Sequence, residues 1–352
     1  CPDLCRKGIE VGDLKSIGTF SYVKALRVLR ADCVVVFDKG WMQDRALLHA
    51  ARYLGIPSLH IQHGSTALLD KVETHHKLNR AICECVKVYK TFRLYNRTIF
   101  SVGLSSLIRS LSYQFHLLNN PNNYYYNHRD EITADKACII GASERDFFIR
   151  KEGYRDDQLI AMGSREYELA YDLAHKELPL PERRVILLIS QPLFEDKYLL
   201  GGMDAKYECI RDIVSSVNTQ EGVHLAVKSH PRESVEWYQQ HFEDEELFVY
   251  PRGTDLNQAI LESRYVIGFF STALVNALIL RRPVGIIRWM GDHGYAPNFD
   301  KDGAAMALNK SSDLIEFIGG YDCSYDVSWY AYDSVVHSVL EETVNGLILG
   351  VE

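Results

Sequence analysis

The chain has 352 residues and the composition of an ordinary globular protein, with 47% hydrophobic and 24% charged residues. Its formal net charge of −8 argues against a broad nucleic-acid-binding surface, because such surfaces are strongly basic. The length exceeds what one hydrophobic core comfortably supports, so we expect two domains of roughly 150 to 180 residues.

The eight cysteines are scattered, and several lie within apolar runs, where cysteine behaves as a small hydrophobic residue. We therefore predict reduced thiols and a cytoplasmic protein. Cys1 with Cys5 and Cys83 with Cys85 are half-sites without a second well-spaced pair, so no metal site is expected. There is no signal-peptide pattern and no uncharged stretch long enough to span a membrane, and the absence of an initial Met leaves an upstream segment open.

The first part of the chain predicts a βαβ unit. The pattern indicates a helix over 22–30, a strand over 32–37, a helix over 43–53 and a strand over 58–61. Two strands joined by a helix are expected to be parallel. Asp38 follows the first strand, and Gln62, His63 and Gly64 follow the second, at the edge of the sheet where ligands collect. The alternative for this polar loop is an ordinary strand-to-helix turn.

Residues 84–116 form a basic stretch in an acidic protein, with five lysines and arginines against one glutamate. Basic helices of this kind contact anionic membrane surfaces or hold an anionic acceptor. A solvated helix face explains the same pattern. The segment is thus our candidate for peripheral contact with the inner face of a membrane, and the three interpretations stay open.

Further strands are indicated at 138–141 and 158–162, with Ser143 expected to cap a helix between them. A helix to about residue 177 follows, and residues 178–184 combine two prolines with charges, as in a linker. We place the domain boundary there. The expected division is 1–177, 178–333, and a closing C-terminal helix within 334–352.

After the linker, the pattern predicts a second α/β domain with strands at 184–190, 223–230, 247–250, 264–270 and 283–287. Candidate binding residues follow three of these strands. They are Gln191 after the first, Lys228, His230, Pro231 and Arg232 at the end of the second, and Ser271 and Thr272 after the fourth. A lysine, an imidazole, a planar guanidinium and two hydroxyls at strand ends suit a phosphate group. A structural loop and an ordinary helix cap are the alternatives.

The ordered set of motifs resembles a known family. His60-Ile61-Gln62-His63-Gly64, then Lys228-Ser229-His230-Pro231-Arg232, then Ser271-Thr272 and Arg282-Pro283 resemble bacterial capsule-type glycosyltransferases of the sialyltransferase and polysialyltransferase group. The resemblance covers roughly residues 30–290. It implies the GT-B fold, in which two Rossmann-like doubly wound domains, an N-terminal acceptor domain and a C-terminal nucleotide-donor domain, face a cleft.

The resemblance implies a CMP-sugar donor, a glycan acceptor and no metal or other cofactor. In that group the His-Pro motif and the Ser/Thr loop hold the nucleotide phosphate, while a carboxylate in the first domain deprotonates the acceptor. Here His63 stands in place of that carboxylate. The Gln-His-Gly loop also resembles the glycerophosphotransferases that use CDP-glycerol, so the donor stays open between the two.

We expect an inverting transfer with His63 as the general base, since an imidazole titrates near neutral pH. Asp38 is the second choice, either as the base or as the group that orients His63. On the donor side, His230 is expected to assist the departing phosphate. Two further classes stay open: a non-catalytic module that binds a nucleotide or glycan, and a nucleotide-sugar epimerase of similar architecture.

Overall fold

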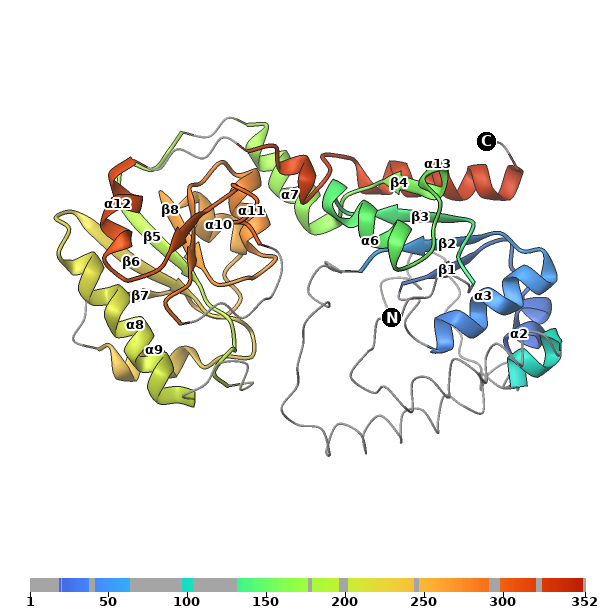
Figure 1. The fold of residues 1–352 in the computed structure, drawn as a ribbon, viewed down its shortest axis with the longest axis horizontal. Coiled ribbons are helices and arrows are strands. Elements are labelled where there is room, and N and C mark those ends of the chain that lie inside the picture. The colour runs from blue at the N-terminus through green and yellow to red at the C-terminus, as the bar shows by residue number, and fades with distance from the viewer. Residues whose placement is uncertain are drawn as a thin grey trace. The chain divides into compact units, whose positions relative to one another are not determined.

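The computed structural model describes residues 19, 21–37, 42–63, 97–103, 132–176, 179–195, 202–243, 247–290, 298–320 and 325–350. The chain divides into two compact units (Figure 1). Unit 1 comprises Cys1–Gly64, Val72–Met162 and Val335–Glu352, and unit 2 comprises Ser65–Lys71 and Gly163–Ser334. The expected boundary after residue 177 therefore lies within unit 2, and the expected closing helix belongs to unit 1.

Unit 1 contains a parallel sheet of four described strands in the order β1-β2-β3-β4. The parallel pairing of the first two strands confirms the βαβ unit. The strands are β1 (Val34–Val36), β2 (Ser58–Ile61), β3 (Lys136–Ile139) and β4 (Leu159–Ala161). The described helices include α2 (Tyr22–Leu29), α3 (Met42–Leu54), α6 (Arg145–Arg150) and α13 (Val336–Leu349), with 3-10 turns η2 (Ala142–Glu144) and η3 (Asp156–Gln158), and residues 97–102 are also helical.

Helix α13, close to the C-terminus, packs on the sheet of unit 1. Its Val336 packs in one core cluster with Leu59 of β2 and Cys138 of β3. Figure 1 shows this helix, in red, alongside the green strands β3 and β4. The C-terminal segment is thus part of the first core.

Unit 2 contains a parallel sheet of six described strands in the order β10-β9-β8-β5-β6-β7. From β5 the chain adds β6 and β7 on one side, and then β8, β9 and β10 on the other. The strands are β5 (Arg184–Ile189), β6 (Val223–Lys228), β7 (Leu247–Val249), β8 (Tyr265–Gly268), β9 (Val284–Ile287) and β10 (Met306–Leu308). The helices are α7 (Arg165–Ala174), α8 (Gly202–Asn218), α9 (Val235–His241), α10 (Leu256–Leu261), α11 (Leu274–Ile279) and α12 (Asp313–Gly320), with the 3-10 turn η4 (Val327–Trp329).

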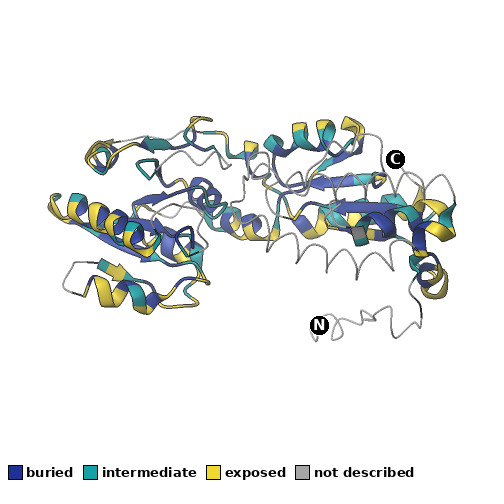
Figure 2. Ribbon diagram, turned by 60° about the horizontal axis from the view of Figure 1, so that its bottom comes forward, coloured by how far each residue is buried: buried dark blue, intermediate teal, exposed yellow. Residues whose placement is uncertain are grey.

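The core of unit 2 is built around β5, whose residues Ile186, Leu187 and Leu188 are fully buried. A continuous apolar run is typical of a parallel strand covered on both faces. Helix α8 contributes one apolar face that includes Ile210 and Ile213. Figure 2 shows the buried strands in dark blue and the outward faces of the helices in yellow. These parallel sheets and their helices confirm the expected class, α/β with two Rossmann-like domains.

Three helices of unit 2 begin at side-chain caps, as their sequences allow. Ser164, Ser234 and Asp255 accept the N–H groups of Tyr167, Trp237 and Gln258. The expected cap at Ser143 is wrong, because this residue lies inside the 3-10 turn η2 and α6 begins at Arg145 without a side-chain cap.

Arg282 has a structural role. Its side chain is 4% exposed, and it donates to the backbone carbonyls of Ile260, Leu261 and Leu280, near the ends of α10 and α11. Burial lowers the pKa of this guanidinium. The arginine of the Arg-Pro element therefore adds side-chain donors to carbonyl groups at the ends of these helices.

Gly285 marks a close approach of β9 to its neighbours and provides a test of the packing. A Cβ atom there would lie 2.8 Å from Leu308 Cδ1 and 3.2 Å from Ile267 Cγ2, both in the core. We expect Gly285→Ala to lower the free energy of unfolding by about 1 to 3 kcal/mol, the usual cost of overpacking. Urea denaturation followed by circular dichroism measures the change.

The matched control is Gly319→Ala in α12, because a Cβ there meets no atom within 4 Å. Alanine has the higher helix propensity, so this variant should be neutral or slightly stabilising. Equal stability of the two variants would contradict the tight packing between β9 and β10.

Candidate functional site

The carboxyl ends of β5, β6 and β8 meet at one edge of the sheet in unit 2. Ile189 of β5 pairs with Lys228 on one side and with Gly268 on the other. Adjacent strands lie about 4.8 Å apart, so the ends of β6 and β8 are roughly 10 Å apart. The chain order reverses between β5 and β8, and ligands of doubly wound sheets bind at such a switch point.

Gln191 connects the two strands at this switch point. Its Oε1 accepts the backbone N–H of Phe270 at 3.1 Å. A Cβ at Gly268 would lie 3.2 Å from the carbonyl oxygen of Ile189 and 3.1 Å from Leu274 of α11, so only glycine fits this approach comfortably. The structure thus gives Gln191 a positioning contact at the place where the sequence predicted a binding residue.

The loop after β8 carries two half-buried hydroxyl residues, Ser271 and Thr272. Ser271 Oγ accepts the N–H of Ala273 at 3.2 Å, which leaves its own proton available for donation. The carbonyl of Thr272 accepts from the hydroxyl of Tyr167 of α7 at 3.4 Å. This hydrogen bond attaches the loop after β8 to helix α7.

The His-Pro turn follows β6, which ends at Lys228, two residues before the expected end. The N–H of Glu233 donates to the carbonyl of His230 at 2.9 Å, which closes the turn. The N–H of Arg232 donates to His230 Nδ1 at 3.1 Å. Because Nδ1 accepts this bond, a neutral His230 carries its proton on Nε2. Pro231 and Arg232 are exposed, and Lys228 is half-buried.

Glu233 was not predicted as a site residue, and its side chain is 0% exposed. Its Oε2 accepts the backbone N–H of His230 at 2.7 Å. Its Oε1 lies 2.8 Å from Ser190 Oγ, 3.0 Å from the hydroxyl of Tyr238 and 2.8 Å from Lys206 Nζ. The one sequence signal for Glu233 was its acidic side chain directly after the His-Pro motif. A carboxylate at a strand end is normally solvated, so this signal did not indicate a buried residue.

Lys206 of α8 supplies the positive charge of this buried cluster. Its side chain is 1% exposed and bridges Glu233 and Glu195, the latter at 2.5 Å. The ammonium also lies 4.6 Å from the ring centroids of Trp237 and Tyr238, within cation–π distance. Burial and the nearby charge of Glu233 raise the pKa of Tyr238, so its hydroxyl remains a donor.

In unit 1, Gln62 and His63 follow β2 and differ in environment. Gln62 is 6% exposed, and its Oε1 accepts the N–H of Ile140 at 2.8 Å, which links the ends of β2 and β3. His63 is exposed. Asp38 and Gly64 lie outside the described residues, as does the basic segment 84–116 except for residues 97–103.

Behind this loop, the buried His60 contacts two aromatic side chains. Its Nδ1 lies 3.0 Å from the hydroxyl of Tyr154, and its ring packs against those of Tyr154 and Phe148. Burial raises the pKa of Tyr154, so the hydroxyl stays protonated. His60 is therefore a core residue, and His63 is the exposed histidine of the pair.

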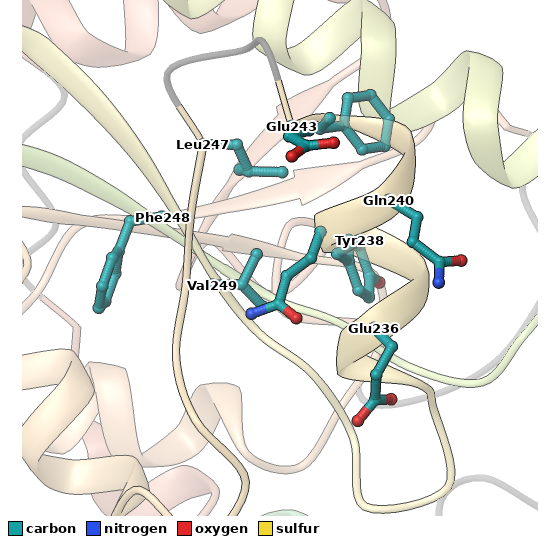
Figure 3. A pocket seen from close by; sticks show the side chains of 9 residues that line it. Glu236, Tyr238, Gln240, Glu243, Leu247, Phe248 and Val249 are labelled. Atoms are coloured by element: carbon teal, nitrogen blue, oxygen red, sulfur yellow. The ribbon is translucent and has the colours of Figure 1, made fainter.

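A separate pocket opens between α9 and the edge strand β7. Figure 3 shows Glu236 and Gln240 projecting from the helix and Leu247 and Val249 from the strand. None of the candidate site residues lines this pocket. Tyr238 connects the two regions, since it lines the pocket and its hydroxyl contacts Glu233.

Within the described ranges, no group of three or more His, Cys, Asp or Glu side chains is arranged to hold a metal ion. The cysteines described there, Cys33, Cys138 and Cys209, are free thiols. The two cysteine half-sites lie outside those ranges. Among the helices in the described part of the chain, none is long and apolar enough to cross a bilayer.

The candidate residues of unit 2 lie in a segment that matches a glycosyltransferase family model. Residues 170–287 match the family model described as glycosyltransferase family 52. This segment holds β5 to β9 and every candidate residue of unit 2. No curated protein sequence matches the chain.

Solved structures are similar at the level of the fold. A proposed UDP-N-acetylglucosamine 2-epimerase from Listeria monocytogenes is 13% identical with a TM-score of 0.51, over 94% of this chain and 78% of that one. A variant of the wall teichoic acid polymerase TagF is 11% identical with a TM-score of 0.41, over 66% of this chain. The chain spans 62% of the length of that polymerase. The calicheamicin glycosyltransferase CalG4 is 11% identical with a TM-score of 0.43, over 93% of this chain and 74% of that one.

The buried ion pairs of Lys206 generate a stability prediction. Lys206→Met keeps most of the side-chain volume but leaves Glu195 and Glu233 without their counter-charge. Breaking a buried pair in this way costs about 3 to 5 kcal/mol of unfolding free energy. Chemical denaturation of the purified variant measures the loss.

Arg155→Met is the control, because its ion pair with Asp157 is solvent-exposed on both sides. This change should leave the denaturation midpoint unaltered. A loss below about 1 kcal/mol in Lys206→Met would mean that the pair behaves like a surface pair.

Proposed function

We propose that the protein is an inverting glycosyltransferase that transfers a sialic acid-type sugar from a CMP-activated donor to a glycan acceptor. One observation carries the proposal. Cationic, imidazole and hydroxyl groups lie on the two strand ends that flank β5, at the switch point, and within the segment matched by the glycosyltransferase family.

The groups of unit 2 suit the phosphate of a cytidine nucleotide. Lys228 and Arg232 supply positive charge, and Ser271 supplies a hydroxyl donor. In its neutral form His230 presents Nε2–H, because Nδ1 accepts a backbone bond. This N–H donates to the phosphate oxygen that gains charge when the bond between CMP and the sugar breaks.

In the proposed reaction, the acceptor hydroxyl attacks the anomeric carbon of the donor sugar. Its proton passes to a general base, and the electron pair of the broken C–O bond leaves with CMP. We assign the base to His63, the exposed histidine after β2, with Asp38 as the second choice or as the group that orients it. Charge on the departing phosphate is stabilised by the side chains of unit 2.

The donor and the location are also part of the proposal. The Gln-His-Gly loop keeps CDP-glycerol as the alternative donor. We also keep the predictions that the protein is cytoplasmic and that its residues 84–116 contact the membrane surface. A binding module without turnover and an epimerase differ from a transferase in whether, and when, they release the nucleotide.

The test is CMP release from CMP-sialic acid and from CDP-glycerol, each with a glycan or polymer acceptor and with EDTA present. Removing one positioned donor to a developing charge costs about a hundredfold or more in turnover, and we expect this from His230→Ala. His63→Ala should lose a similar factor if His63 is the base. His337→Ala, an exposed change on α13, is the control and should keep full activity.

Turnover of CDP-glycerol alone would move the protein to the glycerophosphotransferases. Nucleotide binding without CMP release would support the binding module, and turnover of a nucleotide sugar without acceptor would support the epimerase. Near-normal activity of His230→Ala would show that the His-Pro turn does not serve the leaving group.

A further inference from the structure

We propose that Glu233 is a positioning residue, whose buried carboxylate fixes the His-Pro turn and with it the tautomer of His230. The inference rests on the proposed function, because it concerns the side chain assigned to the leaving phosphate. Glu233 does not itself reach the surface, since its side chain is 0% exposed.

The backbone of His230 is attached to Glu233 by two hydrogen bonds. The carbonyl oxygen of His230 accepts the backbone N–H of Glu233 at 2.9 Å, and the N–H of His230 donates to Glu233 Oε2 at 2.7 Å. Both backbone polar groups of the histidine therefore end on one residue. The closed turn also places the N–H of Arg232 at 3.1 Å from His230 Nδ1, which selects the Nε2–H tautomer.

The other carboxylate oxygen of Glu233 contacts side chains from three different parts of unit 2. Ser190 follows β5, Lys206 belongs to α8 and Tyr238 belongs to α9, and all three contact Oε1. Ser190 Oγ and the hydroxyl of Tyr238 are also 2.7 Å apart. Each hydroxyl has one proton, so together with Lys206 they give two or three donors to Oε1 at any moment.

These contacts of Glu233 restrict motion of the His-Pro turn. A rotation of the carboxylate away from His230 would also break its bonds to a buried lysine and a buried hydroxyl. Arg252 adds a further tie, since its Nη2 donates to the carbonyl of Glu233 at 3.0 Å. The position of His230 is thus set by the core of unit 2, although the residue itself lies in a loop.

The test uses Glu233→Gln, which keeps the size and shape of the side chain. Lys206 and the N–H of His230 contact different oxygens of Glu233. A carboxamide has an NH₂ group in place of one of these oxygens, so in the same position it loses one of the two bonds. We expect kcat for CMP release to fall between about tenfold and a hundredfold, as for a small misplacement of a reacting group. KM for the donor should change by less than about threefold, because Lys228 and Arg232 are untouched.

A second readout does not depend on activity. In protein labelled with 15N-histidine, the His230 signals are assigned by their loss in His230→Ala. The wild type should show the Nε2–H tautomer, and Glu233→Gln should show a mixture of both tautomers. Glu236→Gln is the matched control, because this exposed glutamate of α9 contacts Ser234 and not His230. It should match the wild type in both readouts.

If Glu233→Gln does not fold, the double variant Ser190→Ala with Tyr238→Phe replaces it. This pair removes two hydroxyl donors and keeps the charges and most of the packing. It should lower kcat and mix the tautomers in the same direction. A folded variant with wild-type kcat and an unchanged tautomer would overturn the role of Glu233.

The His230→Ala variant separates the two proposals. If it loses turnover while folded Glu233→Gln is unaffected in both readouts, only the positioning role fails. If it keeps normal turnover, the assignment of His230 to the leaving phosphate fails. The tautomer measurement then still decides whether Glu233 positions the imidazole.

Discussion

Strand β5 hydrogen-bonds along both edges, and the candidate donor site takes its geometry from this pairing. Its register places Lys228 of β6 and Gly268 of β8 level with Ile189. Because all these strands are parallel, the polar residues that follow them emerge at one edge. The chain order reverses beside β5, the place where doubly wound sheets bind their ligands, and Gln191 bonds there to the loop of β8.

The buried charge cluster of Glu233 and Lys206 stabilises the His-Pro turn at this edge of the sheet. Moving a carboxylate and an ammonium out of water is costly unless they are paired and fully hydrogen-bonded. Glu233 and Lys206 are paired with each other, and Glu233 also contacts the hydroxyls of Ser190, which follows β5, and Tyr238 of α9. The His-Pro turn is therefore held by interactions that also maintain the fold, so a change in this cluster affects stability and the site together. A readout of the imidazole itself is needed to separate the two effects.

The sequence predicted most elements because their signals are local. The apolar runs that form β5 and β8 end at polar residues, and the βαβ pattern at 32–61 indicated the parallel pairing that β1 and β2 adopt. Some short elements and some side-chain roles were not predicted. Strand β10 has three residues, and α12 was not predicted. Ser143 resembled a helix cap, but a 3-10 turn precedes the helix. The role of Arg282 is decided by carbonyl groups that two other segments present to it.

By itself the sequence determined the α/β class, the strand ends, and the candidates that follow them, including His63, His230 and Ser271, because hydrophobic periodicity and turn residues act over a few neighbouring positions. Only the tertiary structure decided the strand order and therefore which ends lie at the switch point. It also decided that the side-chain oxygens of Gln62 and Gln191 accept hydrogen bonds from backbone N–H groups. The cluster around Glu233 was invisible for the same reason: its members are separated by up to 48 residues, and only packing brings them into contact.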